Sequence, residues 1–235
     1  MKLRIKFHKL GALKFIGHLD VMRYFQKALR RADIDVAYSG GFSPHQIMSF
    51  ASPLGVGLES YGEYFDVEIL SPISGKDFLE RVNAVCVPEI QVTDVRLLPD
   101  KAGNAMASVA AAGYTIRFRE GRALNTGWQQ KFETFMNQAE ILVTKKTKKG
   151  TAEIDLKPAI YEYNAADDHV YLLANASSEG NIKPTLVMDA FAAYCGEELK
   201  ENALMITREE TYGSRVYKDG KVKFVPLAEF GEWVE

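Results

Sequence analysis

The residues best suited to chemistry in this chain lie in one short segment, YSGGFSPH at positions 38–45. Adjacent glycines, Gly40 and Gly41, permit positive φ angles and the close approach of another group. The hydroxyls of Ser39 and Ser43 and the imidazole of His45 share this loop, so it is suited to holding a phosphate, with its backbone N–H groups as donors. The same composition is typical of a plain turn between strands. No phosphate-binding P-loop pattern is present.

A second candidate site lies at the expected start of the first helix, where Lys14, Gly17 and His18 follow one another closely. Helix N-termini present free N–H groups and favour anions, so these residues are suited to binding a phosphate. The imidazoles of His18 and His45 also have the chemistry of a general base and a general acid acting on an RNA 2′-hydroxyl. The plainer interpretation is that His18 only caps or packs against the helix end.

Basic residues form two clusters, and both are candidate contacts for a phosphate backbone. Residues 1–50 contain nine Lys or Arg and three Asp, a net of +6, although the whole chain has a formal net charge of −2. On the first helix the candidate contacts are Arg23 and Lys27. The second cluster, which we name the lysine tip, consists of Lys145, Lys146, Lys148 and Lys149. Nearby aromatic residues such as Tyr38 offer stacking surfaces for bases.

Both clusters also have a structural interpretation. Arg4 and Lys6 alternate with apolar residues on the first strand and are placed to pair with Asp66 and Glu68 on a neighbouring strand, which would neutralise that face. The lysine tip is also typical of a solvated edge turn.

The elements that must position these residues follow from hydrophobic periodicity. Alternation predicts strands at residues 2–8, 64–69, 91–98, 114–119, 141–144, 151–156, 169–174 and 205–211, and spacings of three and four predict helices at 19–32, 74–85, 128–139 and 184–194. Ser74 and Asp77 resemble a capping box at the start of the second helix. A C-terminal hairpin is expected to turn at Asp219-Gly220.

This order of elements predicts an α+β fold of tandem ferredoxin-like (split βαβ) units with antiparallel sheets and a short C-terminal hairpin. We expect the first unit at residues 1–100, a linker at 101–112, the second unit at 113–212 and the hairpin at 213–235.

Composition excludes several classes of protein. The chain has 235 residues, 47% hydrophobic and 26% charged, which is typical of a globular protein rather than a disordered or fibrous one. Two cysteines, Cys86 and Cys195, cannot supply the four thiolates of a typical iron–sulfur cluster or zinc ribbon. We expect no metal site and no cofactor. Without a signal sequence or an apolar run long enough to span a membrane, the expected location is the cytoplasm, with no membrane partner.

The chain resembles the bacterial radical-SAM-linked proteins, a family with a domain of unknown function. The resemblance lies in KFIGHLD at 14–20, ALRRA at 28–32, YSGGFSPH at 38–45, SF at 49–50, GEYFD at 62–66, KKG at 148–150 and IDLKP at 154–158. Members of that family are encoded beside radical-SAM proteins or fused to their C-terminus. The segment after Pro44-His45 departs from the pattern, because Gln46-Ile47-Met48 stands where the family often has a Pro and a basic residue.

The resemblance implies a radical-SAM protein as partner, and the chain itself lacks the C-x-x-x-C-x-x-C cluster motif of such enzymes. We therefore expect a non-catalytic accessory protein that binds RNA or another phosphate-bearing substrate. Two alternatives remain open, a metal-independent endoribonuclease using His18 and His45, and a pure protein-interaction domain.

Overall fold

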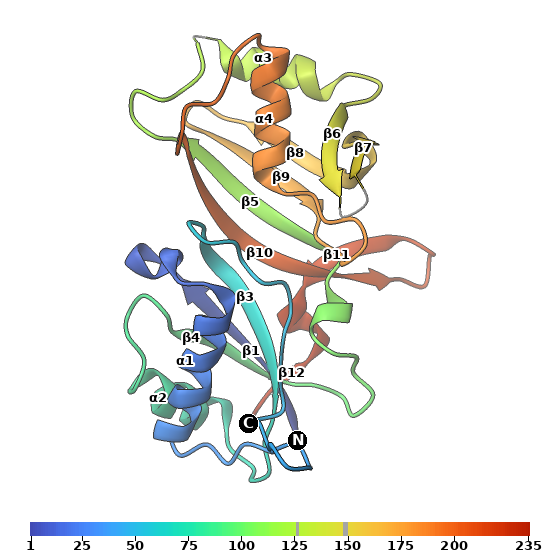
Figure 1. Ribbon diagram of the computed structural model, residues 1–235. Helices are drawn as coiled ribbons and strands as arrows, with labels where there is room; N and C mark the ends of the chain where they lie inside the picture. Colours follow the sequence, from blue (N-terminus) through green and yellow to red (C-terminus); the bar gives the residue numbers. More distant parts are fainter. Residues whose placement is uncertain (126, 148–149) are drawn as a thin grey trace. The chain divides into compact units, whose positions relative to one another are not determined.

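The computed structural model describes residues 1–125, 127–147 and 150–235, and shows a mixed α+β chain (Figure 1). In these residues there are four α-helices, and the strand pairs with a defined register are antiparallel. The chain divides into two compact units. Unit 1 comprises Met1–Ala111 and Arg208–Glu235, and unit 2 comprises Ala112–Thr207.

Unit 1 is built on a sheet in which β12, β4, β1 and β3 are neighbours in that order, with β2 and β10 also pairing with β3. Its elements are β1 (Lys2–Lys9), η1 (Gly11–Phe15), α1 (His18–Arg31), β2 (Met48–Phe50), β3 (Glu59–Glu68), α2 (Gly75–Asn83), β4 (Val92–Leu97), η2 (Met106–Ser108), the Arg208–Val216 part of β10 (Leu204–Val216), β11 (Val222–Pro226), η4 (Leu227–Phe230) and β12 (Glu232–Trp233).

The alternation in β1 separates the two faces of this sheet, as the sequence predicts. Leu3, Ile5 and Phe7 are buried in a core against α1 and α2, which lie together on one face (Figure 1). The ring of Phe7 meets that of Phe25 on α1 at 4.7 Å between centroids, edge to face. Such apolar burial on one face fixes the register, because a slip by one residue would turn Leu3, Ile5 and Phe7 away from the core.

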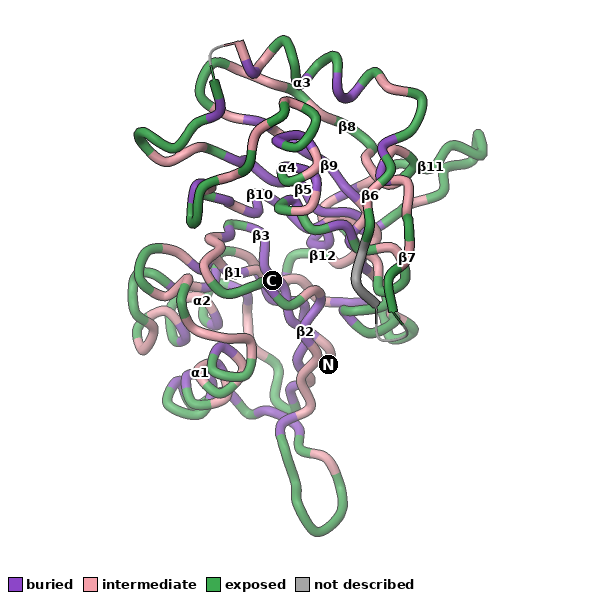
Figure 2. Tube along the Cα trace, turned by 45° about the horizontal axis from the view of Figure 1, so that its top comes forward, coloured by how far each residue is buried: buried purple, intermediate pink, exposed green. Residues whose placement is uncertain are grey.

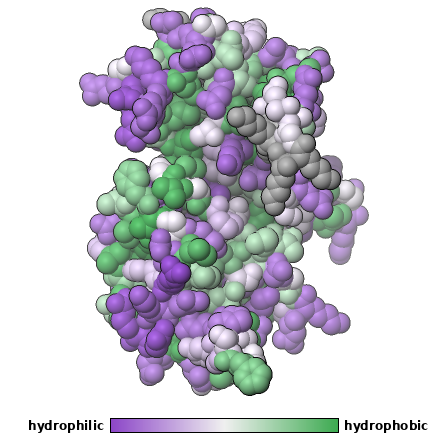
Figure 3. All heavy atoms as spheres, in the orientation of Figure 1, coloured by the Kyte–Doolittle hydropathy of each residue, from purple (hydrophilic) through white to green (hydrophobic). Residues whose placement is uncertain are grey.

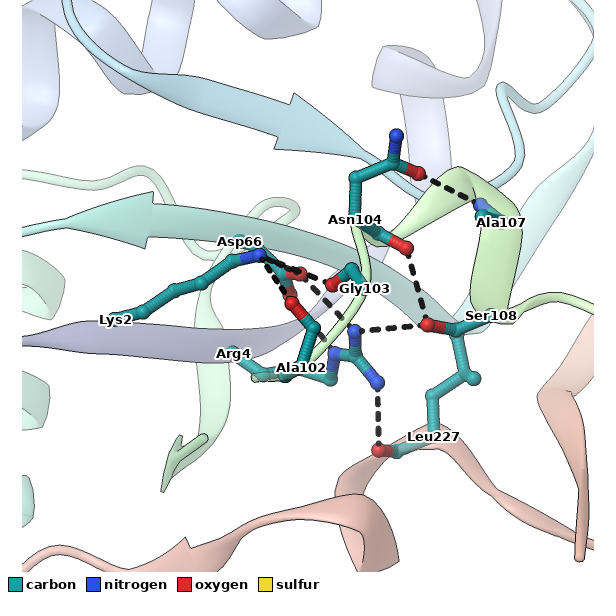
Figure 4. A network of polar contacts seen from close by, with 9 residues as sticks. All are labelled: Lys2, Arg4, Asp66, Ala102, Gly103, Asn104, Ala107, Ser108 and Leu227. Carbon is teal, nitrogen blue, oxygen red and sulfur yellow. Dashed lines mark hydrogen bonds and ion pairs between the residues drawn. The ribbon is translucent and has the colours of Figure 1, made fainter. Parts of the chain in front are cut away.

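The opposite face of β1 holds a buried ion pair (Figure 4). Arg4 lies opposite Asp66 in the register of β1 and β3. Its Nε is 2.8 Å from Asp66 Oδ1 and its second terminal nitrogen 3.0 Å from Oδ2, while other N–H groups donate to the Leu227 carbonyl and the Ser108 hydroxyl. Arg4 therefore ties the 101–110 segment and the C-terminal segment to the sheet.

The C-terminal segment belongs to unit 1 and is not a separate hairpin at 213–235. The hairpin itself forms, with Val216 opposite Val222 in the pairing of β10 with β11. Beyond it, β12 pairs with β4, and the backbone N–H of Gly75 donates to the carbonyl of Val234. Since these partners lie far back in the chain, local pattern could not place this segment.

Unit 2 contains a sheet in which β10, β5, β9 and β8 are neighbours in that order, and a separate pair formed by β6 and β7. Its elements are β5 (Ala111–Phe118), α3 (Trp128–Met136), β6 (Leu142–Thr147), β7 (Gly150–Asp155), η3 (Lys157–Ala159), β8 (Ile160–Ala165), β9 (His169–Asn175), α4 (Pro184–Tyr194) and the first residues of β10, Leu204–Thr207. Phe132 on α3 packs edge to face on Phe191 of α4, at 4.9 Å between ring centroids.

The helices of the described part are short for a membrane. The longest, α1, has 14 residues, and none of them combines the length and apolar character needed to span a bilayer.

Candidate nucleic-acid interface

The start of α1 does not present the charges that the sequence pattern suggests. Gly17 is the N-cap, and its carbonyl accepts the N–H groups of Asp20 and Val21. Lys14 lies in η1, where its Nζ is 3.0 Å from Glu59 Oε1. The charge of Lys14 is therefore already matched within the protein.

His18 is half-buried at the first position of α1. Its ring packs edge to face on Phe50, at 5.1 Å between centroids. Burial lowers the pKa of this imidazole, and the negative charge of Glu63 opposes that shift only in part. A neutral, packed imidazole is the plainer of the two interpretations of His18, and it adds no positive charge for an anion at neutral pH.

Beside His18 lies a buried group of charges that the sequence analysis did not identify. Arg208 of β10 places a terminal nitrogen 2.8 Å from Glu63 Oε1 and 2.7 Å from the Ser52 carbonyl. Lys9 is almost fully buried, its Nζ donates to the Ile16 carbonyl at 3.5 Å, and burial lowers its pKa. Because Glu63 and Arg208 are 145 positions apart, no local pattern shows that they form a pair.

The loop of residues 39–45 is exposed from residue 40 to residue 45, with Ser39 half-buried, and it is closed at its base (Figure 2). The hydroxyl of Ser39 lies 2.9 Å from Nδ1 of His45 and accepts the backbone N–H of His45. Gly41 has a φ of 98°, which requires glycine. Phe42 is fully exposed at the far end of the loop. The structure thus brings Ser39, Ser43 and His45 together, since Nδ1 of His45 also lies 3.5 Å from the Ser43 carbonyl.

The two histidines lie on different elements, and no hydrogen bond or ring contact joins them within the described ranges. The loop that carries His45 ends at Gln46, whose Nε2 donates to the carbonyl of Gln26 on α1. His18 is eight residues before Gln26, which is about 12 Å along the helix axis at 1.5 Å per residue.

The exposed face of α1 carries a basic stripe, which we define as Arg23, Lys27 and Arg30. Their spacings of four and three place them on one face of the helix. Arg23 is 3.5 Å from Asp20 in an exposed pair, which contributes little and rearranges easily. The side chains of Lys27 and Arg30 have no ion pair to any other residue that the structure describes. Hydrophilic side chains gather over α1 and α2 on this face (Figure 3).

The other basic residues of the N-terminal stretch are occupied. Arg4 and Lys2 pair with Asp66, and Lys6 with Glu210 at 2.6 Å, rather than with Glu68. Together with Lys9 and Lys14, they serve the structure of unit 1. The net positive charge that remains available in residues 1–50 is therefore on α1.

Arg30, which belongs to the stripe, and Gln46, which lies beside it, were not among the predicted contacts. Arg30 and Gln46 line a pocket of about 460 Å³ near the C-terminal end of α1, together with Tyr38. The spacing of three residues between Lys27 and Arg30 places both on one helix face, so the sequence could have identified Arg30 as a contact. Nothing in the sequence near Gln46 shows that it meets α1.

The lysine tip falls on unit 2. Lys145 and Lys146 are on β6, opposite Ala152 and Thr151 of β7, so the two strands form the expected hairpin. Lys148 and Lys149 lie outside the described residues.

No group of three or more His, Cys, Asp or Glu side chains suited to a metal ion occurs in the parts of the chain that the structure describes. Burial raises the pKa of both thiols, Cys86 and Cys195, so neither is activated as a nucleophile.

The fold and the site define a mixed α+β chain whose first helix presents a basic face beside a small pocket and an exposed loop. A family described as "Uncharacterized protein conserved in bacteria (DUF2344)" matches residues 2–184, and the chain belongs to this family. No curated protein matches it. Among solved structures, a chain of the "Crystal Structure of a Cbf5-Nop10-Gar1 Complex" is similar, with 10% identity and a TM-score of 0.47. The similarity covers 89% of this chain and 48% of that one, so this chain spans about half its length.

Proposed function

We propose that both units have a ferredoxin-like topology. In unit 1 the order β4-β1-β3 with β2 on β3, and in unit 2 the order β10-β5-β9-β8, each follow the split βαβ pattern of strands. In chain order, α1 follows β1 and α2 follows β3 in unit 1. In unit 2, α3 follows β5 and α4 follows β9. Interstrand nuclear Overhauser effects between β5 and β9 would test the order in unit 2, and their absence would contradict it.

We propose further that the protein is a non-catalytic accessory protein that binds RNA for a radical-SAM enzyme in the cytoplasm. The observation that carries RNA binding is the basic stripe, since Lys27 and Arg30 point into solvent without ion pairs to other described residues. A row of cations on one helix face follows a phosphate backbone. Tyr38, which lines the same pocket as Arg30, is exposed, as is Phe42 on the adjoining loop, and both rings offer stacking surfaces.

Salt dependence of RNA binding tests this proposal. Fluorescence anisotropy with a labelled single-stranded 10-nucleotide RNA, measured over a series of salt concentrations, should give a linear fall of log K with log salt. The triple variant Arg23→Gln/Lys27→Gln/Arg30→Gln should reduce that slope by about 2, since each contact in single-stranded RNA contributes about 0.7.

A matched control removes the same charge elsewhere on unit 1. Lys218, Lys221 and Lys223 are exposed near the turn between β10 and β11. Their replacement by Gln should leave the slope within error of the wild type. If both triple variants lower the salt slope equally, the effect is one of net charge and the stripe is not a specific contact surface. If the wild type does not bind RNA, the proposed function is wrong.

The proposed radical-SAM partner is tested by co-expression of this chain with radical-SAM proteins from the same genome. Co-purification is expected, and its loss after nuclease treatment would mean that RNA bridges the two proteins. Separate migration of the two proteins in the presence and absence of RNA would contradict the accessory role.

A pure protein-interaction domain is the second candidate function, and the full exposure of Phe42 favours it. A single exposed aromatic ring on a loop tip is well suited to an apolar pocket on a partner. Phe42→Ser should then weaken co-purification at high salt and leave RNA binding unchanged. If it instead weakens RNA binding alone, the ring belongs to the RNA surface.

A further inference from the structure

The pocket at the C-terminal end of α1 is lined by polar and aromatic groups that are suited to binding a ligand. Its volume of about 460 Å³ lies in the range of sites for small molecules. The residues that matter for its chemistry are Arg30, Asp35, Tyr38, Gln46, Ser71 and Arg81.

Gln46 supplies an unsatisfied acceptor in this wall. The residue is only 6% exposed, and its Nε2 donates to the Gln26 carbonyl at 3.3 Å and lies 3.4 Å from the Tyr38 hydroxyl. Because a carbonyl only accepts, this contact fixes which end of the amide is the nitrogen. The other end, Oε1, is buried and has no hydrogen-bond partner among the described residues. Buried acceptors are normally paired, so an unpaired one marks a place where an N–H donor of a ligand or an ordered water fits.

Most other polar groups of the pocket already have partners. Arg81 donates to the carbonyls of Ala32 and Asp33, and its terminal nitrogen is 3.6 Å from an Asp33 carboxylate oxygen. The Ser71 hydroxyl donates to Asp35 at 2.5 Å. The guanidinium of Arg30, in contrast, is exposed without a side-chain hydrogen bond or ion pair to the residues that the structure describes.

Tyr38 adds an aromatic surface at the same place. It is 52% exposed, and its backbone pairs with that of Gln46 across the base of the loop. The pocket therefore combines an exposed ring, a buried acceptor and an exposed guanidinium. These three groups match the parts of a nucleotide, which has a flat base, N–H groups on the base edge and a phosphate.

We infer that this pocket takes one nucleotide of the bound RNA. The base stacks on Tyr38, an N–H of the base donates to Gln46 Oε1, and the phosphate lies at Arg30. This inference rests on the proposed RNA binding and names the place on the basic stripe where a base is held, since Arg30 belongs to both the stripe and the pocket.

Three substitutions test the pocket, measured by anisotropy with 10-nucleotide homopolymers of A, C, G and U. Tyr38→Leu should weaken binding about 5- to 150-fold, the range expected from the loss of one base stack. Gln46→Leu should reduce the differences in affinity among the four homopolymers and leave the salt slope unchanged. Arg30→Gln should lower the slope by about 0.7.

Arg31→Gln is the matched control for the arginine. Arg31 is the neighbouring residue on α1 and donates to the Val85 carbonyl outside the pocket, so its loss removes the same charge without touching the proposed site. It should leave affinity and slope close to those of the wild type. Circular dichroism checks that the Gln46→Leu variant folds, since Gln46 is buried. If that variant does not fold, Arg30→Gln still tests the site, because Arg30 is exposed.

The possible outcomes distinguish a failure of the pocket inference from a failure of the proposed RNA binding. The pocket inference is wrong and the function stands if two results occur together. The wild type binds RNA with a salt slope that the triple variant of the stripe reduces, and Tyr38→Leu and Gln46→Leu bind all four homopolymers like the wild type. If the wild type binds none of the four homopolymers, both are wrong.

Discussion

At the scale of single residues, the buried pair Arg4–Asp66 decides how the C-terminal segment is held. Both side chains are only 1% exposed, and the arginine uses its remaining N–H groups on Ser108 and Leu227. Removal of Arg4 leaves the buried Asp66 with only the more distant Lys2, 3.7 Å away, as a counter-ion, and the loss of one partner from a buried pair is costly.

Arg4→Met should therefore lower the free energy of unfolding by about 3–5 kcal/mol, measured by urea denaturation. Arg23→Met, at an exposed pair on α1, should change it by less than about 1 kcal/mol. In the double variant Arg4→Met/Asp66→Leu, both charges are gone and part of the loss should be recovered. A loss for Arg4→Met no larger than that for Arg23→Met would contradict the structural role of the pair.

His18 predicts a pH dependence of stability. Burial lowers its pKa in the folded state below the ordinary value of about 6.5 in the unfolded chain. Above that value both states hold a neutral ring. As the pH falls through about 6.5, the unfolded state takes up a proton first, so stability is lost, and the loss ends below the folded-state pKa.

The wild type should therefore lose more stability than His18→Gln between about pH 7.5 and about pH 5, a range that brackets the ordinary pKa of about 6.5. Urea denaturation at several pH values measures the difference. An NMR titration of the wild type should give His18 a midpoint below the ordinary value, with the variant assigning the signal. Parallel stability profiles for the two proteins would exclude a buried, neutral His18.

At the scale of elements, the sequence was sufficient where the physical cause is local. The alternation of β1 and the helical spacing of α1 predict both elements, because one face of each is buried. The turn at Asp219-Gly220 forms as expected, with Gly220 at a φ of 78°. A burial pattern and a turn residue depend only on neighbours in the chain.

The sequence was insufficient where a partner lies far away. Arg208 looks like a surface residue by type, but it is buried because Glu63 and Ser52 meet it on β3 and the loop before it. Gln46 is similar, since its contact with Gln26 exists only once the loop folds back on α1. The site is thus partly predicted, with the α1 stripe and the loop visible as patterns and the pocket between them visible only in three dimensions.

The start of α2 gives a prediction of its own at this scale. The Ser74 hydroxyl accepts the N–H of Asp77 at 3.1 Å and caps the helix. Ser74→Ala should lower the free energy of unfolding by about 1 kcal/mol, while Ser74→Gly should lower it by only a few tenths, because glycine is itself tolerated at this position. Equal losses in thermal or urea denaturation would contradict the cap.

At the scale of the whole molecule, the formal net charge of −2 is an average over regions of opposite character. Residues 1–50 have a net charge of +6, yet the basic residues before α1 are consumed by pairs with Asp66, Glu210 and Glu59 or by burial. What remains in the described part of residues 1–50 is the stripe on α1 in unit 1. The sequence adds the lysine tip in unit 2. Whether both contact one RNA is a question about the two units acting together.

The lysine tip supplies that test. If it contacts the same RNA as the basic stripe, Lys145→Gln/Lys146→Gln/Lys148→Gln/Lys149→Gln should lower the salt slope by about 3, since each contact contributes about 0.7 for a single strand. The losses from the tip and from the stripe should then add in the combined variant, because substitutions at independent sites usually have additive effects. Anisotropy over a salt series measures both. An unchanged slope in the tip variant would assign RNA binding to unit 1 alone and leave the tip as a solvated turn.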